Sequence, residues 1–218
     1  MKYLKRSVAL VVSLGILSSC VPEQKLIEEN PFIINDGEKP WIIAHGGAKD
    51  LFPENTMVAF DGAMTIGVDA LEMDVKITSD GLLITHHDDT IDRMSDGEGR
   101  VVDYTFEELK QFNFGYDFVD LNGTKPFENN KVEVTLLSDL MDKYTEIPMV
   151  IEVQDEGELG KNASDALIDL IDKNGRKNNT IIASFHDDII EYILDREDKH
   201  LVSTAEGEAR KMVISTKT

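Results

Sequence analysis

Three acidic residues lie inside two apolar runs of this sequence. Glu72 and Asp74 lie in the run from Ala70 to Ile77, and Glu152 lies in the run from Met149 to Val153. Both runs indicate β-strands, and because alternate side chains of a strand point to opposite faces, Glu72 and Asp74 share one face. If helices cover the strand, these acids point inward, where they cannot all stay ionised without a compensating positive charge. A divalent cation with oxygen ligands, Mg²⁺ or Ca²⁺, would supply that charge.

The alternative for Glu72 and Asp74 is an exposed edge strand that carries two solvated acids, because two acids one residue apart are common. Glu152 favours the metal site, since it adds a third carboxylate from a different strand. We therefore expect Glu72, Asp74 and Glu152 to be the metal ligands.

Two histidines follow apolar runs in the same way. His45 ends the run from Trp41 and leads into Gly46-Gly47, where missing side chains let substrate approach the backbone, so Gly46 is a predicted substrate-binding position. His87 ends the run that begins at Leu82. Residues at the carboxyl ends of parallel barrel strands meet at one mouth, where such folds keep their active sites. Two histidines beside a metal are suited to phosphoryl transfer, one as general base and the other as general acid. A single histidine at a strand end is more often a capping or surface group, and we interpret His86 and His186 in that way.

Apolar runs alternate with amphipathic segments from Trp41 onward, which is typical of parallel α/β architecture. A polar excursion between residues 88 and 133 interrupts the alternation. The expected strands are residues 41–44, 70–78, 82–85, 149–153, 180–183 and 201–203, with a tight turn at Ser79-Asp80-Gly81 between the second and the third. The expected helices are residues 55–66, 106–112, 136–144, 163–173, 187–194 and 206–214.

The N-terminal twenty residues predict a secretory leader. A basic start is followed by a short apolar run from Val8 to Leu17, and the segment ends at Cys20, which is the only cysteine among 218 residues. The ending Leu17-Ser18-Ser19-Cys20 resembles a bacterial lipobox, so we expect lipidation of Cys20; the alternative is an ordinary signal peptide. Residues 21–39 are expected to form a tether and residues 40–218 the folded domain. The expected location is therefore the extracytoplasmic face of the cell membrane, held there only by the lipid anchor.

The charge balance argues against polyanions as partners. The chain carries 42 acidic against 22 basic residues, a formal net charge of −20. Such a surface repels nucleic acid and anionic lipid headgroups, since both are polyanions.

The order of these motifs resembles the glycerophosphodiester phosphodiesterase family. The matching segments are Ile43 to Gly47, Pro53 to Thr56, Gly67 to Thr78, His87 to Arg93 and Ile151 to Val153. The resemblance implies a (β/α)₈ barrel that cleaves glycerophosphodiesters to glycerol 3-phosphate and an alcohol with the help of a divalent cation. It also implies that His45 and His87 are the acid–base pair, that Glu72, Asp74 and Glu152 bind the metal, and that Glu54 and Asn55 shape the substrate site.

Two positions depart from the family pattern. Gly46 stands where the family usually has arginine, and Gln154 stands where it tends to have lysine. Two cations that would face the phosphate are therefore missing, and loss of one such transition-state contact typically costs about 10²-fold in rate or more. A metal or another basic residue would have to supply the charge, or the substrate differs.

The domain also looks short for its fold, since a (β/α)₈ barrel takes about 250 residues and only six βα units are expected here. The sequence therefore predicts a fragment or an interrupted copy, or a barrel that a partner completes. The leading function is hydrolysis of small glycerophosphodiesters. The alternatives are a related phosphodiesterase with a phospholipase D-like or wall-polymer substrate, and a non-catalytic lipoprotein that holds a metal.

Overall fold

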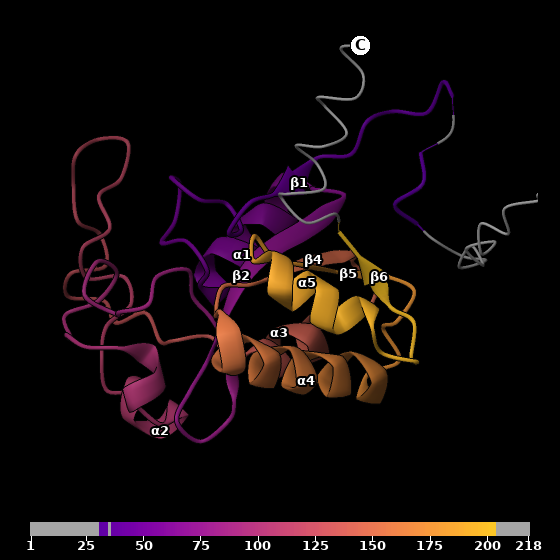
Figure 1. The fold of residues 1–218 in the computed structure, drawn as a ribbon. Coiled ribbons are helices and arrows are strands. Elements are labelled where there is room, and N and C mark those ends of the chain that lie inside the picture. Colours follow the sequence, from indigo (N-terminus) through magenta and orange to yellow (C-terminus); the bar gives the residue numbers. More distant parts are fainter. Residues whose placement is uncertain (1–30, 35, 204–218) are drawn as a thin grey trace, which may run out of the picture.

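A computed structural model describes residues 31–34 and 36–203 (Figure 1). The predicted leader with Cys20 and the expected helix 206–214 lie outside the described residues. Within the described ranges, no helix has both the length and the apolar composition that crossing a bilayer requires.

The centre of the domain is a six-stranded sheet in which β1, β2, β4, β5 and β6 are neighbours in that order. All four pairings along this path are parallel. Parallel strands that follow one another in chain order are typical of a (β/α) barrel, whereas a doubly wound sheet reverses its order part-way. The strands are β1 (Ile43–Ala44), β2 (Ala70–Ile77), β3 (Leu83–Thr85), β4 (Met149–Val153), β5 (Thr180–Ala183) and β6 (Leu201–Val202).

The third strand corrects the expected count of six βα units. Among the named strands β3 pairs with β2, and the pairing is antiparallel, with Ile77 opposite Leu83 and Val75 opposite Thr85. β2 and β3 thus form a hairpin at the carboxyl end of β2, around the turn at Gly81, which has a positive φ of 79°. The described residues contain five parallel strands.

Helices pack against one face of the parallel strands (Figure 1). Leu71, Met73 and Val75 of β2 are fully buried in the main core, together with Phe60 of α1 and Leu167 of α4. The α-helices are α1 (Met57–Ile66), α2 (Phe106–Leu109), α3 (Leu137–Lys143), α4 (Gly157–Lys173) and α5 (Asp187–Leu194), and a 3₁₀ helix covers Val101–Asp103.

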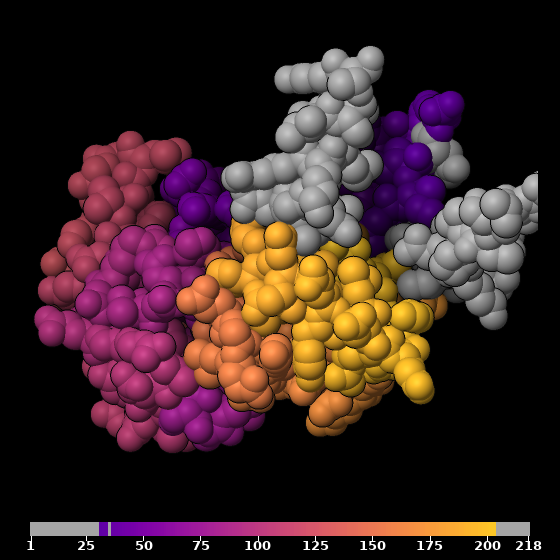
Figure 2. All heavy atoms as spheres, in the orientation of Figure 1, coloured from indigo at the N-terminus to yellow at the C-terminus, as the bar shows by residue number. Residues whose placement is uncertain are grey.

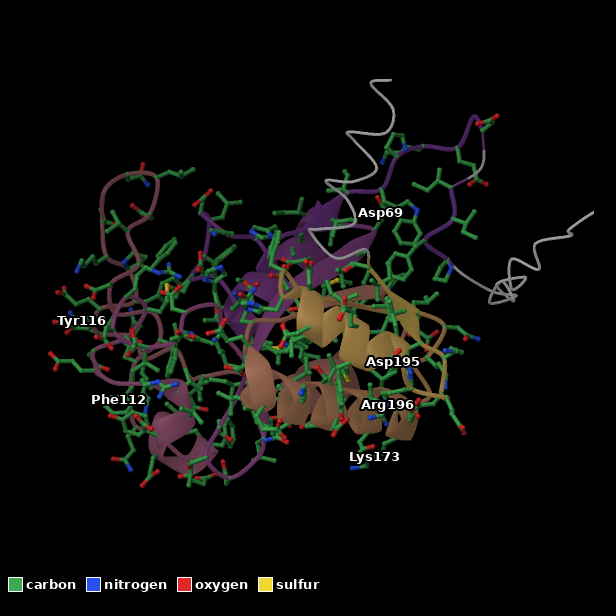
Figure 3. All side chains as sticks on the ribbon, viewed as in Figure 1. Asp69, Phe112, Tyr116, Lys173, Asp195 and Arg196 are labelled. Carbon is green, nitrogen blue, oxygen red and sulfur yellow. The ribbon has the colours of Figure 1, made fainter. Side chains whose placement is uncertain are left out.

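The polar excursion forms a separate lobe beside the sheet. In Figure 2 its atoms make up the left side of the molecule, and in Figure 3 its residues Phe112 and Tyr116 lie far from Lys173 and Arg196 at the opposite side. The lobe and the adjoining β3 share a second, small core, formed by Ile84, Ile91, Val101, Leu109, Phe114 and Val134. Its short helix α2 begins with a capping box between Thr105 and Glu108.

Two local expectations were wrong. α4 begins at Gly157, six residues before the expected start, because Gly157 and Gly160 weaken the helical pattern. Gly160 is needed there, since a Cβ would lie 2.3 Å from the Asp155 carbonyl oxygen. The run before His45 is not a buried strand throughout, because Ile42 and Ile43 are 50% and 45% exposed.

Candidate active site

The three predicted metal-binding acids come together on the inner face of β2 and β4. Asp74 lies directly opposite Glu152 in the parallel register, and Glu72 lies one step earlier on the same face of β2. One carboxylate oxygen from each residue lies within 4.8 Å of the others. Glu72 and Asp74 are buried and Glu152 is half-buried, so the structure brings together the ligand set that the sequence predicted.

The acids are crowded enough to disturb one another. Burial and the neighbouring Asp74 carboxylate raise the pKa of Glu72 to about 7, and Glu152 adds to the rise. Burial and Asp74 also raise the pKa of Glu152. A pKa raised in this way reports negative charge that the protein compensates only in part. A divalent cation fits these oxygens, because it would supply the missing charge.

Three neutral groups hold the carboxylates in place. The Asn55 side-chain amide donates to Asp74 Oδ2 (2.8 Å), and the Asp74 backbone N–H donates back to Asn55 Oδ1 (3.1 Å). The Gln154 amide donates to Asp74 Oδ1 (2.6 Å) and to Glu152 Oε1 (2.7 Å). The Gly46 N–H donates to Glu72 Oε2 (2.8 Å). Gln154 therefore orients the predicted metal ligands, which a lysine at this position would not do in the same way.

The backbone around Asn55 and Gly46 has the shape that these contacts require. Asn55 has a positive φ of 56°, and its N–H donates to the Gly46 carbonyl (2.9 Å). Asparagine tolerates the left-handed region better than most residues. Thr56 then accepts from the Ala59 N–H and begins α1. The predicted substrate residue Asn55 is thus buried behind Asp74, where its contacts are with protein groups.

Both predicted catalytic histidines lie beside the carboxylates. His45 Nδ1 is 2.9 Å from Glu72 Oε2, and its side chain is 66% exposed. His45 and His87 both lie close enough to Glu152 to lower its pKa, against the stronger effect of burial. The antiparallel strand β3 brings His87 to this position, because it carries the chain back toward the middle of β2. There His86, which follows the end of β3 and precedes His87, donates its N–H to the Asp74 carbonyl (2.9 Å).

Glu54, another predicted substrate residue, is part of a chain of ion pairs. Glu54 accepts from Arg93 Nη2 (2.7 Å) and pairs with Lys49 Nζ (2.9 Å). Arg93 also donates to both oxygens of Asp88, which in turn contacts His87 Nδ1 (2.8 Å). The sequence reasoning gave no role to Lys49, Asp88 or Arg93, although the last two lie in the segment that carried the family resemblance.

A buried lysine, Lys76, lies two residues after Asp74 on the same face of β2. Lys76 is 3% exposed, and its ammonium contacts Asp89 Oδ1 (2.5 Å) and Asp155 Oδ1 (3.2 Å). Asp155 also accepts from the Ile77 N–H (3.0 Å). These contacts join the end of β2 to the segment after β4, so Lys76 is already paired and is not a spare cation for substrate.

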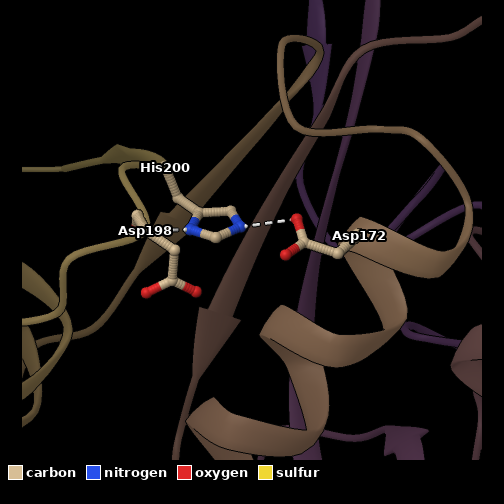
Figure 4. Close-up of side chains that lie close together, drawn as sticks. All are labelled: Asp172, Asp198 and His200. Atoms are coloured by element: carbon tan, nitrogen blue, oxygen red, sulfur yellow. Dashed lines mark hydrogen bonds and ion pairs between the residues drawn. The ribbon is translucent and has the colours of Figure 1, made fainter.

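The other histidines have structural surroundings. His86 is buried, its Nε2 lies 2.9 Å from the Thr90 carbonyl, and its ring packs edge-on against Phe114. His186 directly precedes α5, and its Nδ1 lies 3.8 Å from Glu156 Oε2. His200, with Asp172 and Asp198, forms a second group whose ligand atoms lie within 4.8 Å (Figure 4). His200 Nε2 lies 2.9 Å from Asp172 Oδ1 and Nδ1 lies 3.1 Å from the Asp198 carbonyl, so both ring nitrogens are used within the protein.

A pocket of about 410 Å³ adjoins the ion-pair chain. Glu54 and Arg93 line it on one side, and Phe118 and Val119 of the excursion line it on another. The pocket places the excursion next to the predicted site.

Comparison with known proteins decides the family. The model of the "Glycerophosphoryl diester phosphodiesterase family" matches residues 45–214, which is most of the chain. The chain belongs to the glycerophosphoryl diester phosphodiesterase family. This confirms the resemblance inferred from the motifs between His45 and Val153.

Curated relatives carry the same name. A glycerophosphodiester phosphodiesterase of Caldanaerobacter subterraneus is 48% identical over 80 residues, 37% of this chain and 33% of the relative. Another from Bacillus altitudinis is 38% identical over 105 residues, 48% of this chain and 40% of the relative. The chain spans between a third and two fifths of the length of these relatives.

Solved structures of family members share the fold. The glycerophosphoryl diester phosphodiesterase domain of a Mycobacterium tuberculosis protein aligns with a TM-score of 0.75 at 22% identity, covering 83% of this chain and 65% of that one. An Oleispira antarctica phosphodiesterase in complex with the product sn-glycerol-3-phosphate aligns with a TM-score of 0.67 at 20% identity, covering 81% and 72%. The barrel-type parallel α/β architecture expected from the sequence is confirmed.

Proposed function

We propose that this protein hydrolyses glycerophosphodiesters to glycerol 3-phosphate and an alcohol with the help of a divalent cation. The observation that carries the proposal is the meeting of Glu72, Asp74 and Glu152 on two neighbouring strands, with His45 and His87 beside them. Family membership gives the substrate class, since a relative was solved with sn-glycerol-3-phosphate as its product.

The cation would be held by Glu72, Asp74 and Glu152, and either Ca²⁺ or Mg²⁺ suits three carboxylates. Once bound, it would offset the negative charge of the phosphodiester and polarise a phosphoryl oxygen. Gln154 and Asn55 keep two of the ligands oriented without adding charge. Such hydrogen bonds to metal ligands tune affinity and are part of the site.

His45 and His87 are the proposed acid–base pair. One imidazole takes a proton from the attacking water, and the other gives a proton to the alcohol oxygen as the phosphorus–oxygen bond breaks. Their side chains are 66% and 53% exposed, so both remain open to a small-molecule substrate. The excursion pocket beside Glu54 and Arg93 offers room for part of the substrate.

A coupled assay for release of glycerol 3-phosphate, with and without chelator, tests the proposal. His45→Ala and His87→Ala should each lower turnover by about 10²- to 10⁴-fold, the usual contribution of general acid–base catalysis. His87→Ala should leave cation binding, measured by calorimetry, close to that of the wild type. Full turnover in the presence of chelator would contradict the role of the metal, and full turnover of either variant would contradict that histidine's role.

Gly46 and Gln154 favour a second candidate, a lipoprotein that holds a metal without catalysis. Neither residue can supply the cation that family members usually direct at the phosphate, and Gln154 is occupied by Asp74 and Glu152. Calorimetric binding of Ca²⁺ or Mg²⁺ with no turnover of any phosphodiester would support this candidate. Gln154→Lys adds a cation but removes the amide contacts to Asp74 and Glu152, so a gain of turnover in this variant would favour the enzyme over the binding protein.

For location, we propose anchoring at the extracytoplasmic face of the membrane through lipidated Cys20. The basic start, short apolar run and lone cysteine support this. Metabolic labelling of the full chain with a radioactive fatty acid tests it. Cys20→Ser should abolish the label, and labelling that survives the substitution would contradict the anchor.

A further inference from the structure

Each of the two proposed catalytic histidines presents Nδ1 to a carboxylate, but the two carboxylates differ. His45 faces Glu72, one of the proposed metal ligands, at 2.9 Å. His87 faces Asp88 at 2.8 Å, and Asp88 does not belong to the group of three acids. The carboxylate beside His87 therefore stays available to the histidine when a cation is bound.

Asp88 is fixed from its other side by a forked contact. Arg93 Nε donates to Asp88 Oδ2 (2.5 Å), and Arg93 Nη2 donates to Asp88 Oδ1 (3.1 Å). Paired contacts between a guanidinium and a carboxylate set the orientation of both groups. Although burial raises it, the hydrogen bonds from Arg93 and His87 lower the pKa of Asp88 to about 2.

Arg93 is held in turn by a residue from another loop. Its Nη2 donates to Glu54 Oε1 (2.7 Å), and Glu54 Oε2 pairs with Lys49 Nζ (2.9 Å). Although burial raises it, these two cations hold the pKa of Glu54 below its usual value. Two cations and two anions therefore alternate from Lys49 to Asp88, and the chain of ion pairs is balanced without a charge on His87.

We propose that Asp88, held by Arg93 and Glu54, is a positioning residue that keeps the His87 proton on Nδ1 and turns Nε2 toward the substrate. An ionised carboxylate can only accept a hydrogen bond, so a neutral His87 beside it must carry its proton on Nδ1. The unprotonated Nε2 then has its lone pair on the opposite side of the ring. This inference rests on the proposed function, in which His87 exchanges a proton with the reacting groups.

Asp88→Asn is the informative substitution, because it keeps the shape and reverses the hydrogen bond. With the amide oxygen in the place of Oδ2, it accepts from Arg93 Nε, and the amide N–H₂ in the place of Oδ1 faces His87 while the contact from Arg93 Nη2 is lost. That amide donates to Nδ1 and moves the His87 proton to Nε2. In a comparable arrangement, loss of the carboxylate beside a catalytic histidine lowers kcat steeply by favouring the wrong tautomer.

The tautomer can be measured without any turnover. We expect ¹⁵N chemical shifts of the neutral His87 ring in the wild-type chain to report protonated Nδ1, and those of Asp88→Asn to report protonated Nε2. Asp165→Asn is the matched control, because Asp165 forms the same kind of ion pair with Arg196 at 2.5 Å, away from the site. The same His87 tautomer in wild type and Asp88→Asn would overturn the proposal, and the control should match the wild type.

Kinetics add a second readout. Asp88→Asn should lower kcat by about 10- to 100-fold with KM little changed, because proton transfer is affected more than binding. His87→Ala separates the two proposals. If His87→Ala is inactive while Asp88→Asn keeps the wild-type kcat, the positioning role is wrong and the catalytic role of His87 stands. If His87→Ala is fully active, the proposed catalytic role fails, and with it the reason to position the ring.

Discussion

Two groups of acidic side chains in the described part of the molecule bring three ligand atoms within 4.8 Å, and they differ in what surrounds the acids. The inner group is Glu72, Asp74 and Glu152, and the outer group is Asp172, Asp198 and His200. The inner acids receive hydrogen bonds from side-chain amides and a backbone N–H, His45 lies 2.9 Å from Glu72, and the pKa values of Glu72 and Glu152 are raised. In the outer group a neighbouring cation compensates the negative charge, because Arg196 pairs with Asp198 and lowers the pKa of Asp198.

The difference shows that short distances between acids do not make a metal site. A cation gains most where negative charge is buried and uncompensated, as in the inner group. His200, whose side chain is 1% exposed, directs both ring nitrogens at protein oxygens and joins the end of α4 to the start of β6. We therefore expect the inner group to bind a cation and the outer group to stabilise the fold.

Removing one inner acid gives the largest expected effect. Asp74→Asn should lower affinity for Ca²⁺ or Mg²⁺ by about 10²-fold or more, because losing a ligand costs more than the 10- to 100-fold typical of a group that only orients one. Isothermal titration calorimetry measures it. Asp172→Asn removes the matching acid of the outer group and should leave affinity unchanged; an equal loss in the two variants would end the distinction between the groups.

Removing the support behind Asp74 should have a smaller effect. Asn55→Ala deletes two hydrogen bonds to Asp74 and should lower cation affinity by about 10- to 100-fold. Alanine is also strained at the positive φ of this residue, so Asn55→Gly separates the two causes. Affinity should stay low in Asn55→Gly while the free energy of unfolding recovers in part. Recovery of affinity in the glycine variant would assign the effect to the backbone.

The raised pKa of Glu72 predicts a pH dependence for the inner group. Metal ligands must be deprotonated, so cation affinity should fall as the pH drops below about 7, by at most about tenfold per pH unit for one proton. In the metal-free protein, the free energy of unfolding depends on pH in the opposite direction to the cation affinity. The pKa of Glu72 is raised from 4.5, so its contribution to stability is full below pH 4.5, declines as the pH rises, and is lost above about 7.

Two measurements check this pH dependence. Calorimetry at pH 6, 7 and 8 gives the change in cation affinity, and urea denaturation of the chelator-treated protein gives the change in stability. Glu72→Gln should flatten the stability profile between pH 4.5 and 7, since glutamine cannot titrate. A profile that keeps its slope in this variant would assign the pH dependence to other groups.

The outer group should affect stability alone. His200→Ala removes a buried ring whose nitrogens lie against Asp198 and Asp172 oxygens and should lower the free energy of unfolding by about 1–3 kcal/mol, as measured by urea denaturation. Turnover per folded molecule and cation affinity should match the wild type. A loss of cation affinity here, with the inner group intact, would reverse the assignment of the two groups.

Much of the inner group could be predicted from local sequence. Glu72 and Asp74 alternate with Leu71, Met73 and Val75 along one strand, and this pattern alone sets the two acids on the opposite face from the core. Glu152 follows the same rule in β4. The supporting contacts could not be predicted, because Asn55 reaches Asp74 across 19 residues and Gln154 reaches it across 80.

The route of His87 into the site was predicted only in part. The expected tight turn at Ser79-Asp80-Gly81 is confirmed, since β3 turns back along β2 there, but counting β3 as one of six βα units was wrong. The start of α4 was missed for a local reason, since Gly157 and Gly160 lower helix propensity while the tertiary contact with Asp155 requires Gly160.

The sequence by itself determined the strands, the face on which each acid lies and the identity of the two histidines, because these follow from side-chain alternation and residue chemistry. Only the tertiary structure decided which acids lie close enough to raise one another's pKa, which are paired with a cation and which hold a histidine in place. Those properties depend on groups far apart in the chain, such as Glu54 and Arg93, whose contact exists only when two loops fold side by side. Distances of a few ångströms set the electrostatics, and no local pattern encodes them.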